Sequence, residues 1–349
     1  MAYSLGVDVG TTFTAAALWR DERVELLSLE AHRVTVPTVI SAVGADIRFG
    51  DAAVSRAANL PDSVAREFKR RLGDPVPVFM SGAPYSADRL VALFAKWVTD
   101  VATEQLGERP ERVAVTHPAN WTEFQRHLLS TALDQAGLAA VDLLTEPQAG
   151  ALDFAAAAKL PPGDLVLVYD LGGGTFDLAL LRCEQEGLSH VGEAAGVERL
   201  GGIDFDEAMF QHVLSMVPAA VIEQVRNDPT GRLALAQLRA RCVEAKEALS
   251  SDVSADVPVV LPGMSSTIRV TRAELEDMIR PMLGQTIDLV RQVLDRSGLT
   301  ADALSAVLMI GGSSRIPLVA ELVASELGVP VRIDAHPKLV VARGAARWA

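Results

Sequence analysis

Two short stretches place an aspartate, glycines and threonines directly after an apolar run. Residues 6–12 read GVDVGTT, and residues 170–177 read DLGGGTFD. Glycine has no Cβ, so backbone N–H groups in such turns can approach an anion closely. Threonine hydroxyls donate hydrogen bonds to phosphate oxygens, and aspartates hold a hydrated Mg²⁺ ion. We interpret the two stretches as phosphate clamps, in two related halves that close on one nucleotide.

Two further glycine turns stand at predicted helix starts. Residues 201–204 read GGID, and residues 311–315 read GGSSR. A single glycine-rich turn is common in ordinary loops. Two clamps that each follow a strand and carry an aspartate favour a binding site instead. With those clamps, the further turns suit an adenosine pocket, because glycine lets a base or ribose lie against the backbone.

The elements around the turns predict an α/β protein. Apolar runs at residues 5–9 and 165–169 predict the strands that lead into the clamps. Residues 52–72 have a helical pattern that breaks near Pro61, and the proline-rich residues 75–85 predict a loop. Capping boxes at Thr122 and Thr271 open helices. Further helices are predicted for residues 87–106, 147–158, 233–249, 317–327 and 337–347.

Composition excludes several functional classes. A net charge of −13 argues against nonspecific binding to nucleic acid or to an anionic membrane, since both need a basic surface. We find no secretory signal and no run of about 18 apolar residues that would span a membrane. The two cysteines, Cys183 and Cys242, are expected to be reduced. These features predict a cytoplasmic protein of two or three folded units.

Seven stretches carry a resemblance to one family: residues 6–12, 68–74 (FKRRLGD), 145–150 (TEPQAG), 170–177, 200–206 (LGGIDFD), 244–250 (EAKEALS) and 310–317 (IGGSSRIP). In this order they resemble the nucleotide-binding domain of the DnaK-type seventy-kilodalton heat-shock chaperones. That domain belongs to the superfamily of actin, sugar kinases and heat-shock ATPases. The resemblance implies an α/β, two-lobed, actin-like ATPase fold of duplicated ribonuclease H-like halves, each with an insertion subdomain.

The resemblance also implies domain boundaries. Lobe I comprises residues 1–162, with a core at 1–37 and 108–162 and an insertion at about 38–107. Lobe II comprises residues 163–349, with a core at 163–200 and about 282–349 and an insertion at about 201–281. The sequence ends at Ala349, where the family's nucleotide domain ends, so we expect a shortened protein without the substrate-binding domain.

Site roles follow from the same resemblance. Asp8 and Asp170 would hold Mg²⁺, and K⁺ is a second candidate ion. Lys69 would reach the γ-phosphate and the attacking water, and Glu146 would orient water and metal. Thr175 would position the γ-phosphate, and Asp177 would lie near the catalytic centre. The residues implied to bind ATP or ADP are Gly10, Thr11, Thr12, Gly172, Gly173, Gly174, Gly201, Gly202, Lys246, Ser250, Gly312, Ser313 and Arg315. Without the resemblance, Lys69 would be interpreted as part of a solvated basic face and Glu146 as a helix-start acid.

The chain departs from the family pattern at several positions. Val243 stands where a glutamate is usual, and Glu247 where many members have an arginine that stacks on adenine. Lys338, in the sequence HPKL, replaces an acidic residue of the usual Asn-Pro-Asp-Glu. Asn120 intervenes before Trp121 in a segment where the family usually has two aromatics. The changes at Val243 and Glu247 predict a weakened affinity for the base, and Lys338 removes an acidic residue that borders the metal and potassium region.

We expect slow Mg²⁺-dependent hydrolysis of ATP to ADP and phosphate, which couples nucleotide state to lobe closure. The partners expected from the resemblance are an exchange factor, a co-chaperone or a C-terminal domain, with no nucleic acid and no membrane within this chain. One alternative is a nonhydrolytic nucleotide sensor or scaffold. A second is a small-molecule kinase of the same fold, which would need a carboxylate base beside an acceptor pocket. Fold alone does not decide among these.

Overall fold

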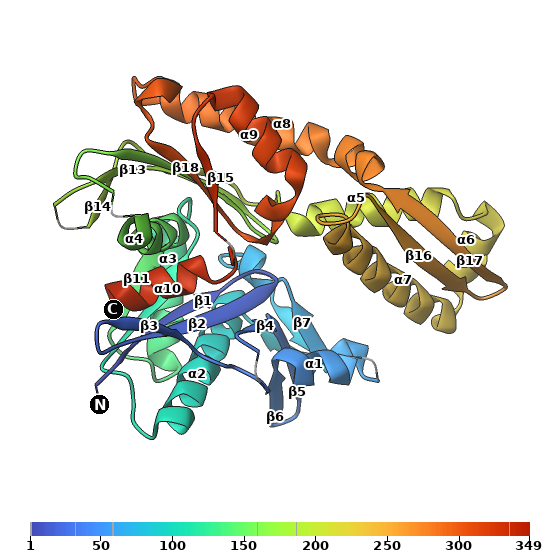
Figure 1. The fold of residues 1–349 in the computed structure, drawn as a ribbon. Helices are drawn as coiled ribbons and strands as arrows, with labels where there is room; N and C mark the ends of the chain where they lie inside the picture. The colour runs from blue at the N-terminus through green and yellow to red at the C-terminus, as the bar shows by residue number, and fades with distance from the viewer. Residues whose placement is uncertain (1, 32, 58, 159, 186, 335) are drawn as a thin grey trace.

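Two mixed β-sheets form the centre of the computed structural model, which describes residues 2–31, 33–57, 59–158, 160–185, 187–334 and 336–349 (Figure 1). The first sheet has the order β11-β10-β1-β2-β3, and β4 also pairs with β2. Its strands are β1 (Ser4–Val9), β2 (Phe13–Arg20), β3 (Arg23–Leu26), β4 (Thr35–Pro37), β10 (Arg112–His117) and β11 (Val141–Thr145).

The second sheet repeats this topology. Its order is β14-β13-β12-β18-β19, and β15 also pairs with β13. In both sheets an antiparallel hairpin (β1–β2 or β12–β13) continues into two parallel strands. The predicted duplicated α/β architecture is thus confirmed. The strands are β12 (Leu165–Leu171), β13 (Phe176–Cys183), β14 (Leu188–His190), β15 (Ala195–Val197), β18 (Ala306–Ile310) and β19 (Val331–Ile333).

Helices cover both faces of each sheet. The outer faces pack against α2 (Ala87–Leu106) and α3 (Glu123–Gln135) in the first half, and against α8 (Arg272–Arg296) and α9 (Pro317–Leu327) in the second. Between the sheets lie α4 (Glu146–Ala158) and α10 (Val340–Trp348), as Figure 1 shows. Alternate residues of β12 face opposite sides, as strand geometry requires: Leu167 and Tyr169 join the α8–α9 core, whereas Val166 and Val168 join the α4 core.

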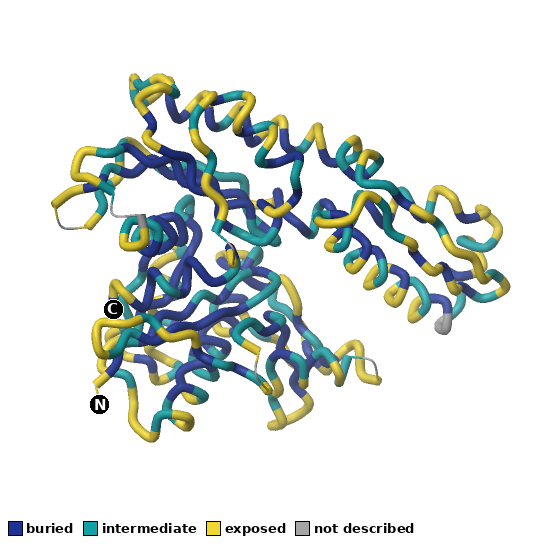
Figure 2. Tube along the Cα trace, viewed as in Figure 1, coloured by how far each residue is buried: buried dark blue, intermediate teal, exposed yellow. Residues whose placement is uncertain are grey.

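Each half carries an insertion at the same side of the molecule (Figure 1). The first contains β5 (Val39–Val43), β6 (Asp46–Phe49), α1 (Gly50–Ala57), β7 (Val64–Arg66), the 3-10 helix η2 (Phe68–Arg71), β8 (Val78–Met80) and β9 (Ala83–Tyr85). The second contains α5 (Gly202–Ser215), α6 (Ala219–Asn227), α7 (Pro229–Ala248), β16 (Ser254–Leu261) and β17 (Met264–Thr271). Figure 2 shows that the helices of the second insertion are exposed on their outer side. The exact lobe boundaries stay a prediction.

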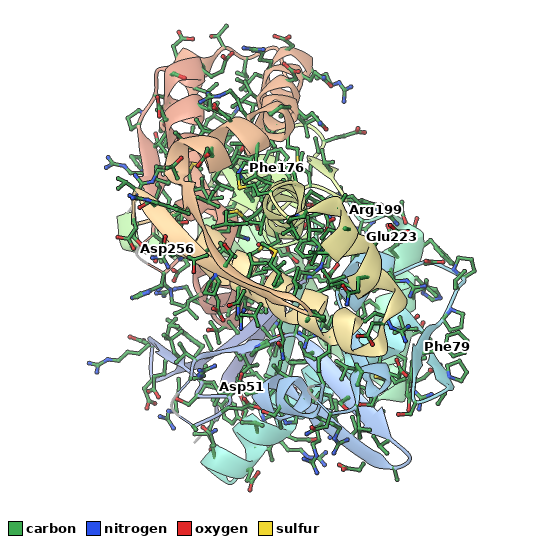
Figure 3. The ribbon with its side chains drawn as sticks, turned by 90° about the vertical axis from the view of Figure 1, so that its right-hand side faces the viewer. Asp51, Phe79, Phe176, Arg199, Glu223 and Asp256 are labelled. Atoms are coloured by element: carbon green, nitrogen blue, oxygen red, sulfur yellow. The ribbon has the colours of Figure 1, made fainter. Side chains whose placement is uncertain are left out.

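Two local predictions in the first insertion are wrong. Residues 52–72 are not one broken helix, because α1 ends at Ala57 and β7 pairs with β5 in a small sheet. Residues 75–85 are not a plain loop, because β8 and β9 form a hairpin with positive φ at Ser81 and Gly82. Tertiary pairing overrides local propensity in both cases. In Figure 3 Phe79 of this hairpin lies at the molecular edge, whereas Phe176 of β13 lies in the packed interior.

Other local predictions are confirmed. The capping boxes at Thr122 and Thr271 are both formed, at the starts of α3 and α8. Cys183 and Cys242 are buried and unpaired. Over the part of the chain that the structure describes, no helix combines the length and apolar content needed to cross a membrane.

Contact between α4 and α10 depends on a glycine. A Cβ built at Gly344 of α10 would lie 1.7 Å from the carbonyl oxygen of Ala149 in α4, a clash with backbone that cannot rotate away. We expect Gly344→Ala to lower the free energy of unfolding by about 1–3 kcal/mol, as overpacked cores do. Urea unfolding followed by tryptophan fluorescence measures this change.

The matched control is Gly284→Ala in α8, where an added Cβ meets nothing within 4 Å. It should raise stability by roughly 0.5–1 kcal/mol, since alanine favours a helix interior over glycine. Equal urea midpoints for the two variants would contradict the packing described for α4 and α10.

Candidate functional site

A cavity of about 460 Å³ lies where the two sheets and the two insertions meet. Its walls come from both halves of the chain. Asp8 and Thr12 border it from the first half, and Asp170, Thr175 and Lys246 from the second. The predicted site residues that line it are Asp8, Gly10, Thr11, Thr12, Lys69, Glu146, Asp170, Gly172, Gly173, Thr175, Gly202, Lys246, Ser250, Gly312, Ser313 and Arg315.

The two predicted clamps face each other directly. A Cβ built at Gly173 would lie 2.3 Å from Oγ1 of Thr12, and one at Gly174 would lie 2.5 Å from Cγ2 of Thr11. Each clamp is the turn of a central hairpin, β1–β2 or β12–β13. Glycine at residues 173 and 174 is therefore what lets the two turns approach this closely.

A buried ion pair lies beside the clamps. The Nζ atom of Lys69, on η2, is 2.5 Å from Oε1 of Glu146, the first residue of α4. Lys69 is 4% exposed and Glu146 is 8% exposed. Burial acts to lower the pKa of Lys69, but the carboxylates of Glu146 and Asp8 outweigh it, so this pKa is raised and the ammonium stays charged. The pair joins the first insertion to the helix between the sheets.

Three aspartates add negative charge around this pair. Burial raises the pKa of Asp8 to about 6, and the charge of Glu146 contributes, although Lys69 opposes the shift. Burial, with the charges of Glu146, Asp177 and Asp8, also raises the pKa of Asp170 well above its usual range. Asp8 keeps some accessible surface because it faces the cavity, yet the surrounding protein removes it from bulk water. Carboxylates held this way favour a bound cation.

These residues fit a magnesium–nucleotide complex. Mg²⁺ usually takes one or two carboxylates, several waters and substrate phosphates as ligands, and rarely an all-protein cage. Asp8 and Asp170 are each the last residue but one of equivalent strands, β1 and β12, and supply such carboxylates. In the described residues no three His, Cys, Asp or Glu side chains converge as a complete metal site. Thr116 donates a hydrogen bond of 2.8 Å to Asp8 and fixes its orientation.

The far wall of the cavity is built on glycine turns and α7. Lys246 forms an ion pair of 2.7 Å with Asp206 and donates to the carbonyl oxygen of Gly202 at 3.1 Å. The hydroxyl of Ser313 donates to the carbonyl oxygen of Gly172 at 2.8 Å. Gly311 has φ of +82°, and a Cβ there would lie 2.6 Å from Oδ1 of Asp170. Because residue 311 is glycine, the predicted adenosine turn can pack directly against Asp170 of the second clamp.

Three predicted residues lie behind the cavity wall. Asp177 is fully buried, and its Oδ1 accepts a hydrogen bond of 2.9 Å from the backbone N–H of Ala119. Gly174 packs against Thr11, and Gly201 packs against the backbone of Gly173 and Gly174. These residues support the clamps from behind. Their assignment to catalysis or nucleotide contact stays a prediction.

Several lining residues are absent from the predicted set. Phe13 follows the first clamp and borders the cavity, as do Asp206, Ser251 and Asp334. Phe13 follows the first clamp and Asp206 ends the stretch LGGIDFD, so their position in the site could have been anticipated. Asp334 and the Asp8 partner Thr116 have no local sequence signal, because their role depends on strands that pair far along the chain.

The raised pKa of Asp177 predicts how stability depends on pH. Burial, with the charge of Glu146, raises this pKa from 3.8 to about 7 in the folded protein. Between those values the folded state holds a proton that the unfolded state has lost, so the Asp177 contribution to stability falls as pH rises through about 7. We expect the melting temperature of the ligand-free protein to fall over this range and Asp177→Asn to flatten the fall.

Differential scanning fluorimetry over a pH series, without nucleotide or Mg²⁺, measures the effect. Asp277→Asn is the control, because Asp277 is exposed on α8. A pH profile as steep in Asp177→Asn as in the wild type would show that Asp177 is not the group responsible.

In a comparison with known protein families, the family described as Hsp70 protein matches residues 74–349. The matched range includes Glu146, the second clamp and the glycine turn at Gly311. The first clamp and Lys69 precede it, so their relation to the second clamp is known from the structure. The match covers well over half of the 349 residues. The chain therefore belongs to the Hsp70 family and contains its chaperone-type nucleotide-binding domain, with the actin-like ATPase fold.

Proposed function

We propose that this protein binds ATP and ADP with Mg²⁺ in the cavity and hydrolyses ATP slowly. The observation that carries the proposal is the close approach of the two glycine–threonine clamps beside the Lys69–Glu146 pair. Hsp70 nucleotide-binding domains in general bind ATP or ADP with Mg²⁺. Backbone N–H groups and hydroxyls of the clamps would bind the phosphates from two sides.

Asp8 and Asp170 would hold the hydrated metal, which when bound neutralises phosphate charge and orients the phosphates. This role suits their raised pKa values, because a cation stabilises the ionised form. Hydrolysis of a phosphoanhydride depends mainly on positioning and charge stabilisation. Residues fixed by buried contacts provide this positioning without further reorganisation.

Lys69, Glu146 and Thr175 would position the attacking water. Glu146 would accept a hydrogen bond from that water, and Lys69 would stabilise charge on the γ-phosphate oxygens. The Lys69–Glu146 contact holds both side chains in place before nucleotide enters. Asp177 is enclosed behind the cavity wall. Its charge would help to keep Lys69 protonated, because it acts to raise the pKa of Lys69.

Hydrolysis fits the site better than transfer to a small molecule. A kinase needs a carboxylate base that faces an acceptor pocket. Asp177 is a buried carboxylate with a raised pKa, but it is 0% exposed and faces Ala119. Asp177 therefore does not supply such a base, and in the reaction proposed here water is the acceptor.

Lobe closure is proposed from a contact between the insertions. Arg70 of η2 forms an ion pair of 2.7 Å with Asp204 of α5. Opening of the cleft would separate Arg70 from Asp204. A bound nucleotide that draws the lobes together would therefore favour formation of this ion pair. A partner would respond to this change if it bound the open or the closed form preferentially. The expected partners are an exchange factor, a co-chaperone or a C-terminal domain. A cytoplasmic location stays a prediction.

ATP binding and single-turnover hydrolysis with Mg²⁺ test the proposal. We expect Lys69→Ala and Thr175→Ala to reduce the hydrolysis rate about 100-fold, the usual scale for loss of one preorganised group. ATP affinity should change much less in Thr175→Ala than the rate does. Controls are Lys96→Ala and Thr267→Ala, which alter residues outside the cavity lining.

Three outcomes would count against the proposal. Tight binding without turnover would favour the nonhydrolytic sensor. Phosphate transfer to an added sugar would favour a kinase. Absence of ATP binding by the folded wild type would remove the nucleotide function itself. Melting temperatures of all variants, measured in parallel, separate loss of function from loss of fold.

A further inference from the structure

Lys338 enters the cavity between the phosphate clamps and the predicted adenosine wall. Its Nζ atom lies 3.8 Å from the ring centroid of Phe13, the residue that follows the first clamp. A Cβ at Gly312 would lie 2.9 Å from Cε of Lys338. Gly312 precedes Ser313, which binds the second clamp through Gly172. Lys338 therefore lies between the residue that follows the first clamp and the glycine turn that supports the second clamp.

The segment that carries Lys338 is fixed by hydrogen bonds. Oδ1 of Asp334 accepts a bond of 2.7 Å from the backbone N–H of His336, and Oδ2 of Asp334 forms an ion pair of 2.8 Å with Arg343 of α10. The backbone N–H of Leu339 donates to the carbonyl oxygen of His336 at 2.8 Å. Arg343 also binds the buried Asp153 of α4. The backbone that carries Lys338 is therefore held in place through Asp334 and Arg343, which connect it to α10 and α4.

The contacts of the ammonium leave capacity for an anion. Glu247 Oε1 lies 3.9 Å from Nζ, beyond hydrogen-bond distance, and its side chain is 56% exposed. Such a pair contributes little. The Phe13 ring offers a cation–π contact but no hydrogen-bond acceptor for the three N–H donors. Burial lowers the pKa of Lys338; the charge of Glu247 opposes this shift, whereas the charges of Arg315 and Lys246 add to it. A bound anion would stabilise the charged ammonium.

The cavity therefore has two electrostatic parts. Asp8, Asp170 and Glu146 form an acidic part beside the clamps, suited to a metal. Lys246, Arg315 and Lys338 form a mixed part toward α7, in which Asp206 pairs with Lys246 and Glu247 lies 3.9 Å from Lys338. If a nucleoside diphosphate lies across the cavity, its α- and β-phosphates would lie between the acidic part and the part toward α7. Lysine binds phosphate as a point charge with several donors.

We propose that Lys338 is a phosphate-binding residue that contacts the α- or β-phosphate of the nucleotide. The inference rests on the proposed nucleotide function and deepens it. Glu247 holds the ammonium weakly in the free protein and yields it to the phosphate. Together with the clamps, Lys338 would then favour ADP and ATP over adenosine.

Calorimetric titration with ADP and competition by adenosine test this role. We expect Lys338→Gln to weaken ADP binding about tenfold or more, the scale of one charge-assisted hydrogen bond, and to leave adenosine affinity within about twofold. Lys338→Arg should restore most of the ADP affinity because it keeps the charge. Glu247→Gln should strengthen ADP binding, because it removes a competing carboxylate.

A purely structural role predicts a different pattern. In that case Lys338→Gln and Glu247→Gln would lower the melting temperature together and change ADP and adenosine affinity by equal factors. ADP affinity unchanged by Lys338→Gln would overturn this inference alone. If the folded wild type bound no ADP, both this inference and the proposed function would fail.

Discussion

Buried negative charge at the meeting point of the two lobes is the constraint on which the rest of the site depends. Asp170 and Glu146 are less than a tenth exposed, and Lys69 offsets only part of their charge. Uncompensated carboxylates are costly inside a protein. The same groups that oppose stability in the ligand-free protein therefore favour any state with a bound cation, and ligand binding and stability are linked.

The close approach of the two clamp backbones gives the site its shape around these charged groups. The clamps meet because Gly173 and Gly174 leave room for Thr12 and Thr11. The sheets are joined by α4 and α10, which pack against each other and against both sheets. By contrast, Arg70 and Asp204 join the insertions through side chains at the rim. Motion of the insertions should therefore cost less than separation of the cores, a division suited to a hinge.

Much of the fold and the glycine turns of the site followed from local sequence, whereas Lys69, Glu146 and Lys246 were predicted only through the family resemblance. Two kinds of feature depend only on neighbouring residues: the glycine turns after apolar strands, and the capping boxes at Thr122 and Thr271. The sequence therefore predicts them directly. The strand β7 and the β8–β9 hairpin were missed, because their pairing is decided by distant partners. Thr116 was missed for the same reason, since only the register of β1 with β10 brings it to Asp8.

The packing of α10 has a consequence for biosynthesis. Gly6 of β1 lies against the backbone of Ala342 and Ala346 in α10, and Ala15 and Ala17 of β2 pack on the same helix. A face of the first sheet to be synthesised is thus covered by a helix from the far end of this sequence. Until α10 emerges from the ribosome, that apolar face stays open to water and to other chains. Contacts so distant in sequence close slowly, which makes the nascent first lobe a natural client for chaperones.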